Sequence, residues 1–188
     1  MGARGNRTTT KQTTYTEPVL LTGLEDLLKQ AEENGCYDGD KLDIGKVVNY
    51  VSSTNPSDPL SLEYVIMDPA TSGSLTYKSG LWTIRVNKNH NVRRQRFTVA
   101  HELGHYMMHR NKAEAFTDEI FFRTESKEGI EYRANEFASK LLMPDERVRK
   151  AIADGVRNLG QLAERFDVSS LAMKVRVQEL GYKLKQNE

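Results

Sequence analysis

The pentapeptide HELGH, from His101 to His105, is the feature that most constrains how this 188-residue chain can fold. It lies inside RFTVAHELGHYMMHR, where apolar residues recur at helical spacing, so we predict a helix over 93–109. Residues four apart in a helix are separated by about 6 Å along the axis and about 40° around it. Both histidines therefore lie on one side, between the apolar face and solvent. Such a helix must border a core on one side and a cleft on the other.

His101 and His105 can bind one metal ion, because imidazoles one helical turn apart can converge at metal–nitrogen distances of about 2.0–2.1 Å. Glu102 falls further round the helix and is expected to lean outward over the cleft. This arrangement suits a metal with an open coordination position. The alternative is an ordinary helix with two histidines on its edge. Gly104 costs up to about 1 kcal/mol in a helix interior, which indicates that another element packs closely there.

A metal site with an open position needs a third protein ligand. His109 continues the four-residue spacing, but it lies about 12 Å along the axis from His101 and is too far away. The downstream segment EGIEYRANEFASKLLMP predicts a second helix over 129–143, closed by Pro144. Its buried face is defined by five apolar residues: Ile130, Ala134, Phe137, Ala138 and Leu141.

The third ligand is expected from this second helix. Glu131 and Asn135 lie on the flank of its apolar face, whereas Glu136 falls on the solvent side. Glu131 is therefore the better candidate ligand, and Asn135 can orient a ligating imidazole through its other ring nitrogen. Glu128 is a rival in position, but we expect Gly129 to leave it outside the helix.

Turn and capping signals divide the rest of the chain into short elements. The Ser79-Gly80 pair predicts a two-residue hairpin turn, and Asp43 is suited to cap a helix. Strands followed by helices indicate an α+β domain. The expected elements are helices over 19–34 and 43–51, strands over 62–67, 75–78 and 81–86, a possible strand over 116–123, and two or three short helices over 145–181.

Composition excludes several classes of protein. No apolar run approaches the ~20 residues of a membrane-spanning helix, and the basic, Thr-rich start lacks the apolar core of a secretory signal. Cys36 is the only cysteine, which excludes an internal disulfide and a cysteine-rich zinc site. We therefore expect a reducing, cytoplasmic location. Any metal must be bound by histidines and carboxylates.

The net charge of +1 conceals an uneven distribution. Residues 18–68 carry ten acids and three bases, whereas residues 69–144 carry twelve bases and eight acids. One interpretation is a pair of solvated surfaces that attract each other weakly. The other is a basic rim around HELGH that attracts an acidic substrate or nucleic acid. Composition alone does not choose between them.

The pair of motifs RFTVAHELGH and EYRANEFASKLLMP resembles the ImmA/IrrE metallopeptidases of bacteria and their mobile elements. The resemblance covers about residues 43–181. It implies a minimal zincin-like fold with a small antiparallel sheet, the HExxH helix and a second helix that provides the third ligand. It also implies one Zn²⁺ per chain, bound by His101, His105 and Glu131, with Glu102 as the catalytic base.

On this basis we expect a disordered basic tail over 1–17, a metallopeptidase domain over 18–144, and a helical segment over 145–188 that packs on it. The resemblance implies cleavage of a specific regulatory protein. The expected substrate is a separately encoded helix-turn-helix repressor of a prophage or mobile element. The alternative is a non-proteolytic regulator, or a toxin–antitoxin component, that acts by binding and holds a structural zinc.

The segment NLGQLAERFDVSSLAMKVRVQELGY is similar to a helix-turn-helix. Ser169 could cap its second helix. Nine bases against seven acids over 145–188 is weak for a phosphate-binding surface, so we do not expect direct DNA binding. The expected core residues are Leu162, Ala163, Phe166, Val168 and Leu171, and the second helix would offer Lys174, Arg176 and Gln178 to a partner.

The sequence does not determine two features of a peptidase site. A second donor for the developing oxyanion is usual, and the candidates are Tyr106, Tyr132, His90 and Arg94. An extended substrate could pair with a strand edge. The strand over 81–87 could provide that edge, or it could be an ordinary paired strand.

Overall fold

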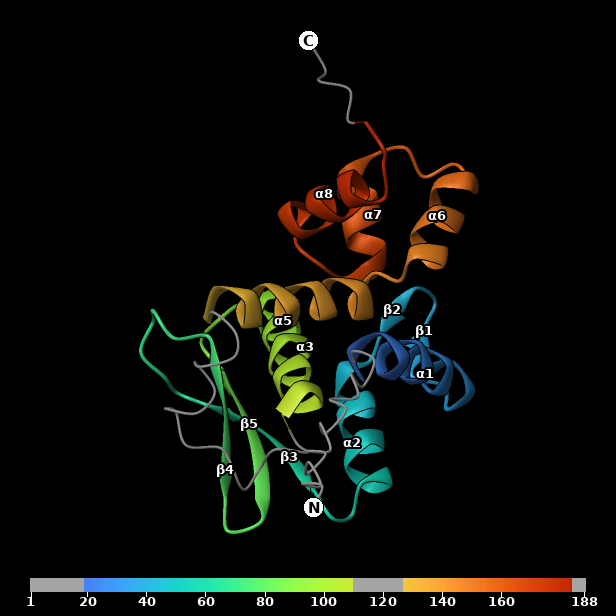
Figure 1. Cartoon of the computed structure of the whole chain (residues 1–188). Coiled ribbons are helices and arrows are strands. Elements are labelled where there is room, and N and C mark those ends of the chain that lie inside the picture. The colour runs from blue at the N-terminus through green and yellow to red at the C-terminus, as the bar shows by residue number, and fades with distance from the viewer. Residues whose placement is uncertain (1–18, 110–126, 184–188) are drawn as a thin grey trace, which may run out of the picture.

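The computed structural model describes residues 19–109 and 127–183. The predicted tail over 1–17 and the possible strand over 116–123 lie outside the described residues. In chain order the elements are the helix α1 (Val19–Glu33), the short strands β1 (Tyr37–Asp38) and β2 (Lys41–Leu42), the helix α2 (Ile44–Thr54), the strands β3 (Leu60–Val65), β4 (Gly73–Lys78) and β5 (Leu81–Asn87), and the helices α3 (Val92–His109), α5 (Lys127–Leu142), α6 (Asp145–Ala153), α7 (Leu159–Phe166) and α8 (Ser170–Glu179) (Figure 1).

Local signals in the sequence set most of these boundaries. Asp43 caps α2 by accepting a hydrogen bond from the Lys46 amide at 3.1 Å. Gly35, with φ of 61°, follows α1 in the left-handed conformation that ends many helices. Ser79 and Gly80 join β4 to β5 with φ values of 52° and 81°, as a type I′ hairpin turn requires. The predicted α+β class is confirmed.

The main sheet is mixed, so the expected antiparallel sheet was wrong in one pairing. β4 and β5 pair antiparallel, but β3 pairs parallel with β5, in the order β3-β5-β4. β5 is the most deeply buried strand and takes the centre, where Trp82, Ile84 and Val86 are fully buried. The connection over 66–72 carries the chain past the position of β5 to the opposite edge, where β4 lies.

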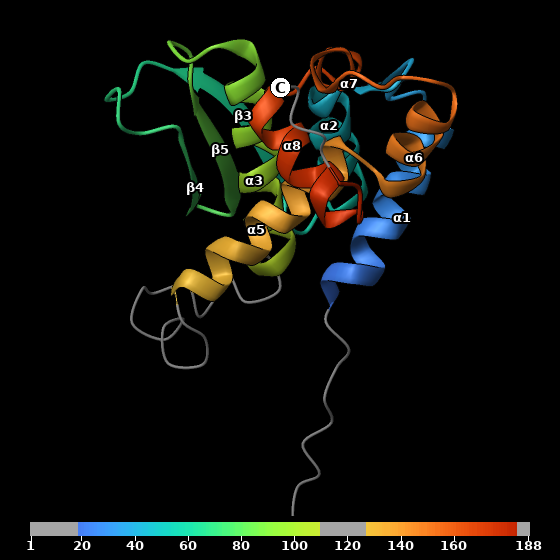
Figure 2. The same ribbon diagram turned by 90° about the horizontal axis from the view of Figure 1, so that it is seen from above.

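Helix α3 occupies the middle of the molecule. Both views place it between the sheet and α2, with α5 across it (Figures 1 and 2). Its buried face consists of Val99, Ala100, Leu103 and Tyr106. A Cβ atom added to Gly104 would lie 3.0 Å from Cδ1 of Phe137, so α5 does pack closely at this glycine. The two helices that carry the predicted ligands are thus held in direct contact.

Helices α6, α7 and α8 share one hydrophobic cluster with the preceding elements. Polar contacts add to this packing. The buried Arg96 of α3 donates to the carbonyl oxygen of Leu42 at 2.8 Å and to that of Asp167 at 3.1 Å. The carboxylate of Asp167 also accepts from Lys41 at 2.8 Å and from Arg93 at 3.3 Å. Asp167 follows α7, so this cluster joins α7 to α3 and β2.

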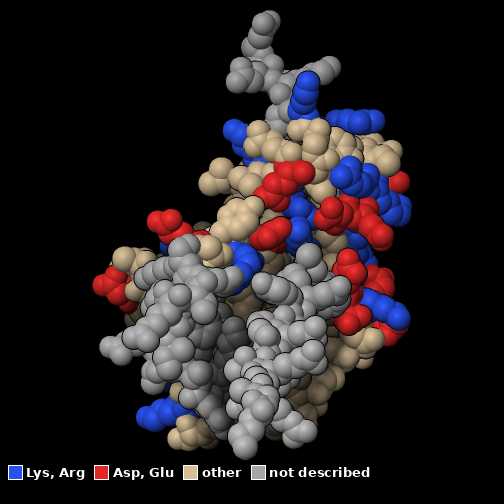
Figure 3. Space-filling view, in the orientation of Figure 1, with Lys and Arg blue, Asp and Glu red and all other residues tan. Residues whose placement is uncertain are grey.

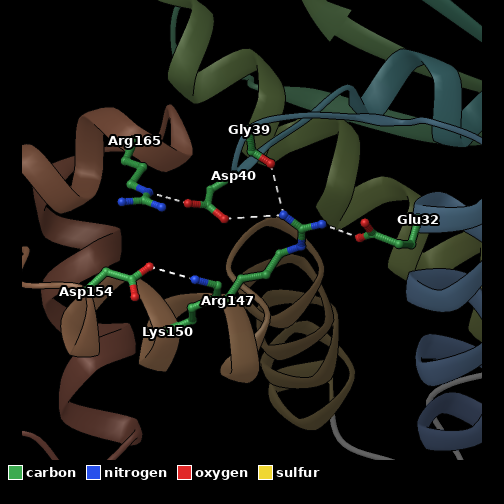
Figure 4. Close-up of polar contacts among 7 residues, drawn as sticks. All are labelled: Glu32, Gly39, Asp40, Arg147, Lys150, Asp154 and Arg165. Atoms are coloured by element: carbon green, nitrogen blue, oxygen red, sulfur yellow. Dashed lines mark hydrogen bonds and ion pairs between the residues drawn. The ribbon is translucent and has the colours of Figure 1, made fainter.

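A second group of ion pairs joins α6 and α7 to the N-terminal elements (Figure 4). Asp40, in the β1–β2 turn, pairs with Arg147 of α6 and Arg165 of α7. Arg147 also pairs with Glu32 of α1. Acidic and basic side chains are accordingly interleaved on the side of the molecule where α1 and α6 lie (Figure 3). These charges largely compensate one another at the surface.

The α7–α8 pair keeps most of the predicted helix-turn-helix core. Leu162, Ala163, Phe166 and Val168 are buried, and Ser169 caps α8 by accepting from the Ala172 amide at 3.1 Å. Leu171 is 71% exposed, so its expected core role was wrong. With α8 beginning at Ser170, Met173 and Val177 face the core and Leu171 faces away from it.

Arg176 is also placed differently from expectation. It was a candidate for partner contact, but it is only 2% exposed. Its Nε donates to the carbonyl oxygen of Met143 at 3.0 Å, and its guanidinium pairs with Asp145 and Glu179. No helix in the described part of the chain is long and apolar enough to cross a membrane.

Candidate metal centre

Two donors of the candidate centre come from α3. Nε2 of His101 and Nε2 of His105 are 3.0 Å apart, as expected for residues one turn apart on one side of a helix. Both side chains are partly buried, with 16% and 14% of their surface exposed. Burial lowers the pKa of His105 to about 4, and the charge of His101 acts in the same direction. The His105 imidazole is therefore neutral near pH 7, which is the form that binds metals.

The third donor comes from α5. Oε2 of Glu131 lies 3.3 Å from Nε2 of His101, and Oε1 lies 3.4 Å from Nε2 of His105. One ligand atom from each of the three residues falls within 4.8 Å of the other two. The structure therefore brings together the three residues predicted as ligands.

The spacing of these donors fits a tetrahedral metal. Two ligands at about 2.0–2.1 Å from a zinc ion and at the tetrahedral angle are about 3.3 Å apart. The two imidazole nitrogens are 3.0 Å apart, and each lies 3.3–3.4 Å from one of the two oxygens of Glu131. Two imidazoles and a carboxylate are also a donor set that zinc accepts, and they leave a fourth position free. The residues at this site therefore fit a zinc ion.

Asn135 lies one turn after Glu131 on α5 and contacts the other ring nitrogen of His101. Its Oδ1 is 3.0 Å from Nδ1 of His101. If Nδ1 carries the proton and donates it to this oxygen, Nε2 presents its lone pair toward Glu131 and His105. Such a contact fixes the tautomer and the ring orientation of a metal ligand. Asn135 thus contacts one of the two candidate histidine ligands, as the sequence predicted.

Glu102 is more buried than its helical angle suggested. It was expected to lean outward, but only 8% of it is exposed. Burial and, to a smaller extent, the negative charge of Glu131 together raise the pKa of Glu102 to about 7. A Cβ atom on Gly73 would lie 2.4 Å from Thr98 and 3.5 Å from Oε1 of Glu102. The start of β4 therefore covers this carboxylate, and only glycine allows the approach.

A cavity of about 450 Å³ contains the three donor residues together with Glu102 and Asn135. Its wall also includes Ser72 and Gly73, which the sequence did not single out. A glycine at the start of a strand next to serine was the only available signal, and it is a weak one. Of the described residues that line this cavity, Arg94 is the one Lys or Arg side chain. The cavity wall itself therefore gives little support to a strongly basic rim.

The four candidate oxyanion donors are dispersed. Tyr106 is fully buried, and its hydroxyl donates to the carbonyl oxygen of Asp58 at 2.7 Å, away from the cavity. The ring of His90 contacts the carbonyl oxygen of Pro69 at 3.1 Å, and Tyr132 is 67% exposed outside the cavity wall. Arg94 lines the cavity and donates to Oγ of Ser72 at 2.8 Å. Arg94 is therefore the candidate that the fold brings to the site.

Glu128 lies inside α5, in its first turn and exposed, so its expected place outside the helix was wrong. A glycine in the first helical turn costs little, because the amides there have no partners within the helix. Glu128 is nevertheless not among the grouped donors. The side chain of His109, which we rejected as a ligand on distance, lies outside the described residues.

The fold and the donor set together define a class: a minimal zincin-like α+β domain in which an HExxH helix and a second helix face one cavity. A family model described as the IrrE N-terminal-like domain, Peptidase_M78, matches residues 64–178. This range includes both motif helices and most of the sheet, and it covers more than half of the chain. The chain belongs to this family of the ImmA/IrrE metallopeptidases.

Two known proteins are similar to parts of the chain. Metallopeptidase ImmA of Bacillus subtilis (strain 168) is 30% identical over 98 residues, which are 51% of this chain and 56% of ImmA. A solved structure, a Mycobacterium tuberculosis transcriptional regulator, aligns with a TM-score of 0.57 at 15% identity. That alignment covers 87% of this chain and 48% of the regulator. The chain thus spans about half the length of each relative, and the second likeness concerns the fold alone.

Proposed function

We propose that this protein is a zinc-dependent metalloendopeptidase in which His101, His105 and Glu131 bind the metal and Glu102 is the catalytic base. The observation that carries the proposal is the convergence of ligand atoms from three residues, within 4.8 Å of one another, beside a buried carboxylate. Membership of the family supports it. A metal bound at an open site supplies Lewis-acid polarisation of a carbonyl and makes nearby water more acidic.

Glu102 has the properties that a general base needs at this site. A catalytic group works best when its pKa lies near the working pH, and burial and the charge of Glu131 together raise the pKa of Glu102 to about 7. Its carboxylate would accept a proton from the attacking water and later return it to the leaving amine. The contact between β4 and α3 at Gly73 excludes bulk water from one side of this carboxylate. Arg94, on the wall of the cavity, would donate to a substrate oxygen.

The edge of β4 is our candidate for substrate pairing. The earlier candidate, the strand over 81–87, is β5, which is paired on both sides and cannot accept another strand. β4 is at the edge of the sheet, and the cavity wall includes its first residue, Gly73, and the preceding Ser72. An extended peptide added to this edge would run past the cavity.

The proposed substrate is a bacterial regulatory protein, specifically a helix-turn-helix repressor of a prophage or mobile element. Membership of the peptidase family supports a protein substrate, and a repressor is the substrate that the resemblance of the two motifs implies. A second candidate function is that of a non-proteolytic regulator that acts by binding a partner and holds a structural metal. The likeness of the fold to a transcriptional regulator is compatible with that role.

The substitution Glu102→Gln separates the two functions. Glutamine keeps the size of the side chain and leaves the three donors in place, but it cannot accept the proton. We expect zinc content near one per chain in both forms and cleavage of the repressor only by the parent, read by mass spectrometry of intact products. If the variant relieves repression in cells as well as the parent does and no fragment forms, the binding function is the correct one.

A further inference from the structure

An open groove of about 550 Å³ lies between α3, α5 and α8. Phe97 of α3, Tyr132 of α5, and Leu171 and Val175 of α8 contribute apolar surface to its walls. The groove is therefore built jointly by the HExxH helix, the helix of the third donor and the C-terminal helical segment. Its volume is within the range of about 300–1,000 Å³ that is usual for ligand pockets.

The apolar residues on the walls are unusually exposed. Leu171 is 71% exposed, Tyr132 is 67% exposed and Val175 is 46% exposed. Leu171 and Val175 are four residues apart, so they lie on the same side of α8. A cluster of large apolar side chains in contact with water costs free energy, and on a folded protein it commonly marks a binding surface.

The groove continues into the candidate metal cavity. Arg94, Phe97 and Asn135 line both hollows, and Asn135 also contacts the ring of His101 at 3.0 Å. A chain that occupies the groove can therefore extend directly to the donors. This continuity favours the substrate itself as the occupant.

Three of the four charged side chains that line the groove pair with opposite charges within the protein, and the fourth, Arg94, donates to Oγ of Ser72 at 2.8 Å. Arg93 pairs with Asp167 at 3.3 Å, and Glu136 pairs with Lys140 at 2.7 Å. Glu179 pairs with the buried Arg176 at 3.3 Å. The remaining walls are mainly apolar, so the groove suits uncharged side chains better than an acidic or basic segment.

We infer that this groove binds large apolar side chains of the substrate polypeptide close to the peptide bond that is cleaved. In this role α8 is a specificity element, and Leu171 and Val175 are its contact residues. The inference rests on the proposed peptidase function, because that function is what would cleave the bound chain. The binding itself can be measured without catalysis.

The test uses full-length Glu102→Gln protein loaded with zinc, which should bind a peptide without cutting it. A phage-displayed library of random 12-residue peptides is selected on this protein, and the recovered peptides are labelled for fluorescence anisotropy. We expect peptides that carry large apolar residues. Binding should weaken at least about 10-fold when Leu171→Asp or Val175→Asp is added, because a buried aspartate would lose its hydration.

Gln178→Asp is the matched control, since it adds the same charge to an exposed position of α8 that does not line the groove. It should leave peptide binding and zinc content unchanged. Recovery of no peptides, of peptides without apolar residues, or of peptides that bind the groove variants equally well would overturn the inference. So would a dimer in light scattering that Leu171→Asp converts to monomer, because a second copy would then occupy the groove.

The same reagents separate this inference from the proposed function. Suppose that the peptides need Leu171 and Val175 for binding but the parent protein cleaves neither the peptides nor the repressor. The groove is then a peptide-binding site, and the proposed peptidase function is wrong. If the parent cleaves the repressor and both groove variants cleave it at the parental kcat/KM, the peptidase function stands and the groove assignment fails.

Discussion

At the scale of single residues, the identity of the third donor depends on which side of α5 an acidic residue occupies. Glu131 and Glu136 are both acidic and both lie on α5, but only Glu131 faces His101 and His105. Glu136 instead pairs with Lys140, one turn further along the same helix. The flank position of Glu131 follows from the periodicity of α5, and its distance to the histidines follows from the packing of α5 on α3.

We predict that Glu131→Ala sharply weakens metal binding, whereas Glu136→Ala leaves it unchanged. Loss of a group that only orients a ligand typically weakens metal affinity 10–100-fold, so loss of a direct ligand should cost at least about 100-fold. Competition with a fluorescent zinc chelator measures the affinity. Equal retention of zinc by the two variants would contradict the assignment of the third ligand.

Gly104 tests the contact that holds the donors together. A Cβ atom there would lie 3.0 Å from Cδ1 and 3.3 Å from Cβ of Phe137. The second of these atoms is next to the backbone and cannot easily move. Alanine would gain up to about 1 kcal/mol in helix propensity, but overpacking costs about 1–3 kcal/mol.

We therefore predict that Gly104→Ala lowers the free energy of unfolding of the metal-free protein by about 1 kcal/mol. Urea denaturation followed by circular dichroism measures this change. Gly45→Ala is a suitable comparison, because it is also a helical glycine and a Cβ atom there meets only the Asp43 side chain, at 3.3 Å. Stabilisation by Gly104→Ala would show that α5 moves aside at little cost.

At the scale of elements, Asp167 connects α7 to the helix of the metal site. Its φ of 52° is left-handed, a conformation in which Asp and Asn are enriched. Burial raises the pKa of Asp167, but hydrogen bonds from Lys41 and Arg93 and the charge of Arg96 outweigh it, so the pKa is lowered. The charged form of Asp167 therefore stabilises the folded protein.

The direction of the shift sets a pH window. Asp167 contributes stability above its ordinary pKa of 3.8, and the contribution is lost as the pH falls through the lower folded value. We predict that Asp167→Asn costs roughly 1–2 kcal/mol at pH 7 and that parent and variant converge below about pH 3.8. Urea titrations at several pH values measure this difference, and a constant difference across the window would contradict it.

At the scale of the whole molecule, the C-terminal helices share a core with the rest of the described chain. Arg176 shows why helix-turn-helix similarity does not by itself indicate DNA binding. Its side chain is 2% exposed, donates to the carbonyl oxygen of Met143 and pairs with Asp145 and Glu179. We propose that residues 145–181 pack on the peptidase domain and contribute to partner binding rather than reading a DNA sequence.

We predict that Arg176→Ala destabilises the protein by roughly 1–3 kcal/mol, because it leaves a buried carbonyl without its donor. Its acidic partners are about half exposed, which keeps the loss below the 3–5 kcal/mol typical of a fully buried pair. Thermal unfolding measures the effect, with the exposed Lys174→Ala as the control. An electrophoretic shift on duplex DNA at physiological salt that Lys174→Ala abolishes would overturn the proposal that residues 145–181 do not read a DNA sequence.

Local periodicity and capping were enough to determine several parts of this protein from its sequence. They indicated the HELGH helix, the flank position of Glu131, the hairpin at Ser79-Gly80 and the α+β class. Each depends on residues a few positions apart, whose relative geometry a helix or a turn sets by itself. The sequence alone was therefore enough to propose the three donor residues.

The tertiary structure decided what depends on contacts between distant segments. It made β5 the central strand, buried Tyr106 and Arg176, exposed Leu171, and brought Gly73 against Glu102. Strand order follows from which strand is most completely covered, and helical phase alone does not say which neighbour covers a residue. The raised pKa of Glu102 and the groove beside the donors exist only because α3, α5, α8 and β4 pack around them.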